Sequence, residues 1–335
     1  MKSSEKKIII NWLYCGLLLV ALMIVIGGIT RLTHSGLSMV EWNLISGAIP
    51  PLNDLEWKES FKKYQQFPEF KKINSSMVLS EFKVIFFWEY IHRLLGRLIG
   101  LFFIIPLIIF WVKKWINQKQ KKQLIILLSL GSLQAFLGWY MVKSGLVDIP
   151  AVSHFRLAIH LFTAFVLMCY IYWLILDFSN TVKKTSKSIN RFSKYLIVAL
   201  FIQIIYGAFV AGLKAGYSLN GNWVIQNIFG YSLNKENTFD LLNSSNDIQA
   251  FHRFFAWIIF GITIAFFNKT RKTHLNKEGL VVIGLTLLQI VLGISTLLLR
   301  VQIHLAVIHQ LTAIILLLSV LKITYLSNEK TQLDT

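Results

Sequence analysis

One apolar stretch, Phe82–Gly100, carries side chains that could do chemistry inside a membrane. Its sequence, FKVIFFWEYIHRLLGRLIG, contains a carboxylate, an imidazole and two guanidinium groups among hydrophobic residues. On a helix, Glu89, His92 and Gly96 share one face, so a proton-active group and a metal-capable ring lie beside a position without a side chain. Ionisable groups at membrane depth are costly, and those that face protein rather than lipid mark functional sites. The stretch therefore predicts a reactive site on the inner face of a membrane helix.

An internal repeat matches His92 with His252 and His160 with His309. FWEYIHRLLG resembles the later segment IQAFHRFFAW, and FRLAIHLFTAF resembles HLAVIHQLTAI. The repeat-matched residues are His92, His160, His252 and His309. Two imidazoles per half suit a haem held between two histidines better than a closed zinc site, which needs four ligands, or a di-iron site, which needs several carboxylates. A single histidine in a span is more often a hydrogen-bonded packing residue, but four matched ones favour one haem in each half.

The two halves differ three residues before the first histidine, where Glu89 corresponds to Gln249. A carboxylate in the first half alone predicts a reactive site there, in which Glu89 shuttles protons or stabilises positive charge during an oxidation. The second half would then hold an electron-relay site. The alternative is a buried carboxylate that pairs with an arginine such as Arg93. Arg93, Arg97 and Arg253 could also bind haem propionates or extend to lipid headgroups.

The composition is that of a polytopic membrane protein. Of 335 residues, 55% are hydrophobic and 15% are charged, and the mean hydropathy is +0.58. Apolar runs of about 20 residues are long enough to cross a bilayer as helices. We expect eight of them, near residues 9–29, 84–112, 123–142, 157–177, 195–213, 248–268, 280–299 and 303–325. The predicted fold is therefore all-α, with a kink at Pro106.

The formal charge of +18 could suggest nucleic-acid binding, but the positions of the basic residues instead indicate how the chain is oriented in the membrane. Lys and Arg fill the connectors after the second, fourth and sixth spans, which lie on one side of the membrane; the positive-inside rule makes this side the cytoplasm. Both termini are expected on the same side, with the basic N-terminal end leading into an uncleaved first span. Segments 30–83 and 214–247 then lie outside. The aromatic-rich segment 30–83 is expected to form short surface helices over a site, or an interfacial loop.

The repeat indicates duplication of a four-helix unit. The motif Q-x-x-x-G occurs in the third, fifth and seventh spans, as Gln134/Gly138, Gln203/Gly207 and Gln289/Gly293, while the first span has Met23/Gly27. Four spans per half is an even number, so the two bundles should have the same orientation, as parallel repeats. We predict an N-terminal half at residues 1–178 and a C-terminal half at residues 179–335. The two cysteines, Cys15 and Cys169, lie in spans and offer neither an exported disulfide nor a metal site.

The chain resembles the haem A synthase family over nearly its whole length. The resemblance is carried by GGITRLTHSGLSMVEW (Gly27–Trp42), GAIPPL (Gly47–Leu52), EFKVIFFWEYIHRLLGR (Glu81–Arg97), LGWYMVKSGL (Leu137–Leu146) and HFRLAIHL (His154–Leu161). The second half is similar mainly at FHR (Phe251–Arg253) and at His309-Gln310. Another branch of the family has a cysteine pair in the first outer loop, which this chain lacks. The resemblance is therefore to the group found in many Gram-negative bacteria and in mitochondria.

The resemblance implies an oxidoreductase that converts the C8 methyl group of haem O to the formyl group of haem A, the cytochrome oxidase cofactor. By matched position, His92 and His160 would flank the substrate haem in the first half, with Glu89 in catalysis. His252 and His309 would ligate a haem b in the second half. Expected partners are a haem O synthase, an electron donor such as a ferredoxin or quinol, and the lipid bilayer; a homo-oligomer is left open. The expected location is the bacterial inner membrane, with both haem sites toward the periplasm.

Two other function classes use the same histidines. A di-haem b-type cytochrome that passes electrons between a quinone and a partner would need neither Glu89 nor a cover over the site. A haem or small-molecule transporter built on the repeat is a third class. Four ligand-like histidines at one depth argue against the alternating access that transport requires.

Overall fold

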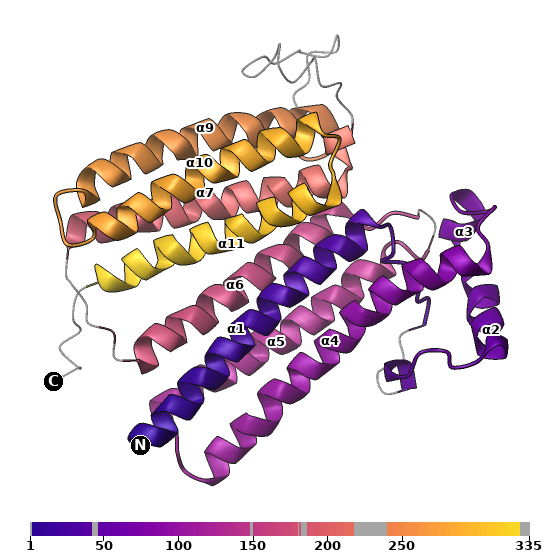
Figure 1. The fold of residues 1–335 in the computed structure, drawn as a ribbon, viewed down its shortest axis with the longest axis horizontal. Coiled ribbons are helices and arrows are strands. Elements are labelled where there is room, and N and C mark those ends of the chain that lie inside the picture. Colours follow the sequence, from indigo (N-terminus) through magenta and orange to yellow (C-terminus); the bar gives the residue numbers. More distant parts are fainter. Residues whose placement is uncertain are drawn as a thin grey trace. The chain divides into compact units, whose positions relative to one another are not determined.

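The computed structural model describes residues 2–41, 46–147, 150–179, 181, 186–217 and 240–328, and over these residues the chain is helical, without strands. The long helices are α1 (Ser3–Leu32), α4 (Leu79–Val112), α5 (Gln118–Lys143), α6 (His154–Phe178), α7 (Lys187–Gly212), α9 (Ser245–Thr270), α10 (Asn276–Leu298) and α11 (Ile303–Leu326) (Figure 1). These eight helices of the described part are long and apolar enough to cross a membrane. The prediction of an all-α, eight-span membrane protein is confirmed.

Several helices extend beyond the apolar runs from which they were predicted. α1 begins at Ser3 and α5 at Gln118, because an exposed polar turn can continue a helix without contributing to hydropathy. At the start of α5, the Asn117 side chain accepts a hydrogen bond from the backbone of Gln120, which caps the helix. α4 runs without interruption through Pro106, so this proline does not end the span.

The chain divides into two compact units. The first consists of Met1–Glu5 and Cys15–Leu167, and the second of Lys6–Tyr14 and Met168–Thr335. In the second unit, α7 contacts α9 and α11, and α10 contacts the same two helices, so the four close into a ring (Figure 1). In the first unit, α4 contacts α5, and α1 lies against α4, where the Thr30 hydroxyl donates to the Trp88 carbonyl at 3.2 Å. The duplication, the division at residue 178 and the side of the termini stay predictions.

The outer segment of the first unit packs on the beginning of α4. It contains a 3₁₀ turn (Ser46–Ala48), α2 (Asp54–Tyr64) and α3 (Pro68–Lys72), so the described part forms short helices. An aromatic cluster joins them to α4; its buried members are Tyr64, Phe82 and Phe86, and Trp57, Phe61 and Phe70 pack against these. Burial raises the pKa of Tyr64, so the phenol stays protonated and donates to Glu69 Oε2 at 3.1 Å. Trp42 and residues 218–239 of the second outer segment lie outside the described residues.

Candidate functional site

Each of the four repeat-matched histidines lies against a glycine of a neighbouring helix. A Cβ atom added at Gly27 on α1 would lie 3.4 Å from Cε1 of His92 on α4. The same distance is 3.1 Å for Gly138 and His160, 3.2 Å for Gly207 and His252, and 3.2 Å for Gly293 and His309. A side chain at Gly138, Gly207 or Gly293 would press on the imidazole, whereas one at Gly27 would make an ordinary van der Waals contact with it.

The sequence reasoning did not link these glycines to the histidines. Their motif, Q-x-x-x-G, is visible in the sequence, but its partner is not, because the histidine lies on the following helix. The signal that could have found the pairing is that each glycine-bearing span directly precedes a histidine-bearing span. In each half, two such pairs build the site.

The glutamine of the motif also contacts the histidine. Gln134 Nε2 donates to the backbone carbonyl of His160 at 3.0 Å and lies 3.1 Å from its Nδ1. Thr163 Oγ1 donates to Gln134 Oε1 at 2.6 Å, which fixes the orientation of the amide. Gln203 Nε2 donates in the same way to the His252 carbonyl at 2.9 Å. Together, glycine and glutamine orient the ring as outer contacts orient a metal-binding histidine.

The two histidines of each half lie within electrostatic range of each other. His92 and His160 lie near enough for their charges to interact, and so do His252 and His309. In the second unit, α9 and α11 occupy opposite corners of the four-helix ring, so its histidines come from opposite sides. The predicted pairing of ligands within each half is thus compatible with this geometry.

The histidine pair of the second unit fits a haem. Nδ1 of His252 and Nδ1 of His309 are buried and have no hydrogen-bond partner, which is unusual for polar atoms in a protein interior. Each ring as a whole is only partly buried, so part of its surface is open for contact. Among the described residues no group of three or more His, Cys, Asp or Glu side chains could hold a metal ion. Paired imidazoles on facing helices suit a planar metal cofactor.

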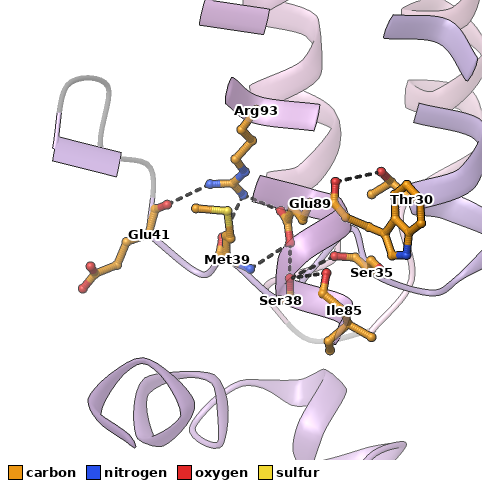
Figure 2. Close-up of polar contacts among 9 residues, drawn as sticks. Thr30, Ser35, Ser38, Met39, Glu41, Ile85, Glu89 and Arg93 are labelled. Atoms are coloured by element: carbon orange, nitrogen blue, oxygen red, sulfur yellow. Dashed lines mark hydrogen bonds and ion pairs between the residues drawn. The ribbon is translucent and has the colours of Figure 1, made fainter. Parts of the chain in front are cut away.

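The Glu89 carboxylate lies in a dense polar network that joins α4 to the segment after α1 (Figure 2). Glu89 is 3% exposed. Its Oε2 accepts hydrogen bonds from Ser38 Oγ at 2.7 Å and from the Met39 backbone N–H at 2.8 Å. Its Oε1 forms an ion pair with Arg93 Nη2 at 2.6 Å. The pairing with Arg93, considered above as an alternative, is therefore present, and the carboxylate is held by three donors.

The arginines predicted to bind propionates lie beside the histidines on their helices. Arg93 donates from Nη2 to the Met39 carbonyl at 2.7 Å and from Nη1 to the Glu41 carbonyl at 2.9 Å, so its guanidinium is bound to the outer segment. Arg97 and Arg253 are partly exposed on α4 and α9. Their role toward propionates stays a prediction.

A methyl group added at Gly293 is expected to reduce haem retention in the second half. The new Cβ atom would lie 3.2 Å from His309 Cε1, so the ring must shift by a few tenths of an ångström. Gly284→Ala is the matched control, because Gly284 lies on the same helix and a Cβ atom there meets nothing within 4 Å. Both changes stabilise the helix by up to about 1 kcal/mol, so the two variants differ only in the contact of the new Cβ atom with His309. Haem content per protein should fall for Gly293→Ala and not for Gly284→Ala; equal content in both would contradict the expectation.

Comparison with known proteins identifies the family of the chain. The family model COX15-CtaA, described as cytochrome oxidase assembly protein, matches residues 10–321. The haem A synthase of Flavobacterium johnsoniae is 41% identical over 334 residues, which cover 95% of this chain and 96% of that protein. The haem A synthase of Flavobacterium psychrophilum is 43% identical, with coverage of 94% and 96%. That of Nitrosospira multiformis is 41% identical, with coverage of 97% and 94%.

Proposed function

Because the chain belongs to the cytochrome oxidase assembly family that includes the haem A synthases, we propose that it is a haem A synthase. Its reaction is the oxidation of the C8 methyl group of haem O to the formyl group of haem A by successive hydroxylations, with loss of water from the resulting gem-diol. The observation that carries the proposal is that each half contains two histidines within electrostatic range of each other, each ring in contact with a glycine of a neighbouring helix.

The two halves have different tasks in this proposal. His92 and His160 flank the substrate haem O, and Glu89 supports the reaction beside them. His252 and His309 would hold a resident haem b, which would supply a redox centre there. The difference rests on the residue three positions before the first histidine, because the second half has Gln249 there. Gln249 is 1% exposed and donates to the Ala215 carbonyl at 3.1 Å, but its amide does not ionise near neutral pH and cannot act as a general acid or base.

The protein contributes position, charge and shielding to this chemistry. Haem iron together with an oxidant supplies the oxidising power. Gly138 and Gln134 fix the ring of His160, and Gly27 fixes that of His92, so that a bound macrocycle is held in one orientation. The Glu89 carboxylate, held by its three donors, offers a negative charge that stabilises positive charge developing during the oxidation. The outer segment, packed on α4 through its aromatic cluster, keeps water from this end of the site.

The proposal includes a location and partners. A multi-pass protein with haem sites near the outer ends of its helices fits the bacterial inner membrane, with the sites toward the periplasm. A haem O synthase supplies the substrate. An electron donor such as a ferredoxin or a quinol would supply the electrons.

Haem extraction from cells that coexpress the chain with a haem O synthase tests the function. Chromatography of the extract should show haem A, or its hydroxylated precursor, beside haem b. Membranes with the haem O synthase alone are the control and should contain haem O without haem A. Purified protein that contains haem b alone, although haem O is supplied, would overturn the proposal in favour of a di-haem electron-transfer cytochrome.

A further inference from the structure

We propose that Ser38 positions the Glu89 carboxylate, and that Glu89 and Arg93 together fasten the segment Ser35–Glu41 onto α4. We call this segment the outer strap. The inference deepens the proposed function, since it concerns how the first-half site is completed. It rests on contacts between residues about 50 positions apart in the chain, in which α4 binds the backbone that follows α1.

The strap begins at a turn that the backbone specifies. α1 ends at Leu32, and His34 has a φ of 55°, in the left-handed region. This conformation reverses the chain, and the Ser35 N–H donates back to the Thr30 carbonyl at 2.9 Å. Ser35, Leu37 and Ser38 are then buried. The strap is thus a packed element whose position is set at its start by α1 and further along by α4.

The ion pair on α4 binds both polar groups of one strap residue. The Met39 N–H donates to Glu89 Oε2 at 2.8 Å, and the Met39 carbonyl accepts from Arg93 Nη2 at 2.7 Å. Glu89 and Arg93 also bind each other at 2.6 Å. Hydrogen bonds that involve charged groups are about twice as strong as neutral ones. The Met39 backbone is therefore held by the two charges at once, as Figure 2 shows.

Ser38 donates a further hydrogen bond to the Glu89 carboxylate. Its hydroxyl lies 2.7 Å from Glu89 Oε2, 3.0 Å from the Ser35 carbonyl and 3.4 Å from the Ile85 carbonyl. A serine hydroxyl has one proton to donate, and the short distance to a charged acceptor favours the carboxylate. Two of the three hydrogen bonds on Glu89 thus come from the strap. If the strap left α4, the carboxylate would keep only Arg93.

The second unit has a related contact without the charge. Lys214, just after α7, has a φ of 53°, as His34 has after α1. Gln249, at the position that corresponds to Glu89, donates to the Ala215 carbonyl at 3.1 Å. In both units, the side chain three residues before the histidine holds the segment after the preceding helix. Only the first unit uses a carboxylate with an arginine. In that unit, the outer strap is held by Glu89 and Arg93, and the Glu89 carboxylate is in turn held by the strap.

Hydrogen exchange and product analysis of Ser38 variants test the proposal. Ser38→Ala removes one hydrogen bond to a charged group, so amide exchange in the strap should become about tenfold faster, and haem A formation should fall about tenfold. Haem b content should not change. Ser38→Thr, which keeps the hydroxyl, should restore both properties. Ser35→Ala is the matched control, because the Ser35 hydroxyl contacts Thr33 Oγ1 at 2.7 Å rather than Glu89.

The outcomes separate this inference from the proposed function. Unchanged strap exchange in Ser38→Ala would overturn the positioning role, and so would equal losses of haem A in Ser35→Ala. A failure of Ser38→Thr to recover haem A, despite slow exchange, would also overturn it. If the unmodified protein forms no haem A, the proposed function fails, while the exchange measurements still decide whether Ser38 and Glu89 hold the strap.

Discussion

Replacement of His252 or His309 by alanine is expected to remove haem b from the purified protein. Each ring lies against a glycine, at Gly207 and Gly293, and each has a buried Nδ1 without a hydrogen-bond partner. An alanine offers no ligand to iron, and one remaining imidazole would have to hold the haem from one side. The loss should be nearly complete for either single variant. The haemochrome spectrum and the chromatographed extract measure it.

His304→Ala is the control for this prediction. His304 is exposed and lies on α11, five residues before His309, so its replacement removes an imidazole from the same helix without touching the pair. Substrate binding in the first half should survive the loss of haem b, and haem O should still copurify with the His252→Ala variant. Full haem b content in the double variant His252→Ala/His309→Ala would show that the ligands lie elsewhere.

Replacement of Arg93 by methionine is expected to destabilise the protein by about 3–5 kcal/mol, the usual result of leaving a buried charge without its partner. The side chains of Arg93 and Glu89 are only 9% and 4% exposed. Methionine fills a similar volume but leaves the Glu89 carboxylate without its cation. It also removes the donors to the Met39 and Glu41 carbonyls. The thermal unfolding midpoint, measured in one detergent for all variants, should fall clearly.

A second substitution separates charge from packing. Glu89→Gln in the Arg93→Met background removes the buried charge, so the double variant should regain most of the lost stability. Arg156→Met is the control for loss of one positive charge, because the Arg156 guanidinium is bound at an exposed site, 3.8 Å from the Tyr140 ring. If the Arg93→Met variant were no less stable than the Arg156→Met variant, the Glu89–Arg93 ion pair would not hold the outer strap on α4.

The sequence by itself determined the spans and the main chemical groups. Hydropathy is a local property, and about 20 apolar residues in succession have few alternatives to a membrane helix. The internal repeat identified His92, His160, His252 and His309 without coordinates, because duplicated segments keep the spacing of their side chains. The difference between Glu89 and Gln249 is likewise readable from the aligned segments. These inferences need only the order of residues within a single helix.

Only the tertiary structure decided which residues surround those groups. The glycine beneath each imidazole lies on the preceding helix, and its partner depends on how two helices pack. Ser38 and Met39 reach Glu89 from 51 and 50 residues away in the chain, and no periodicity relates such positions. Sequence patterns report what each segment does alone, whereas the contacts that orient a histidine or a carboxylate arise when separate segments meet. The candidate ligands could therefore be named from the sequence, but the residues that contact them could not.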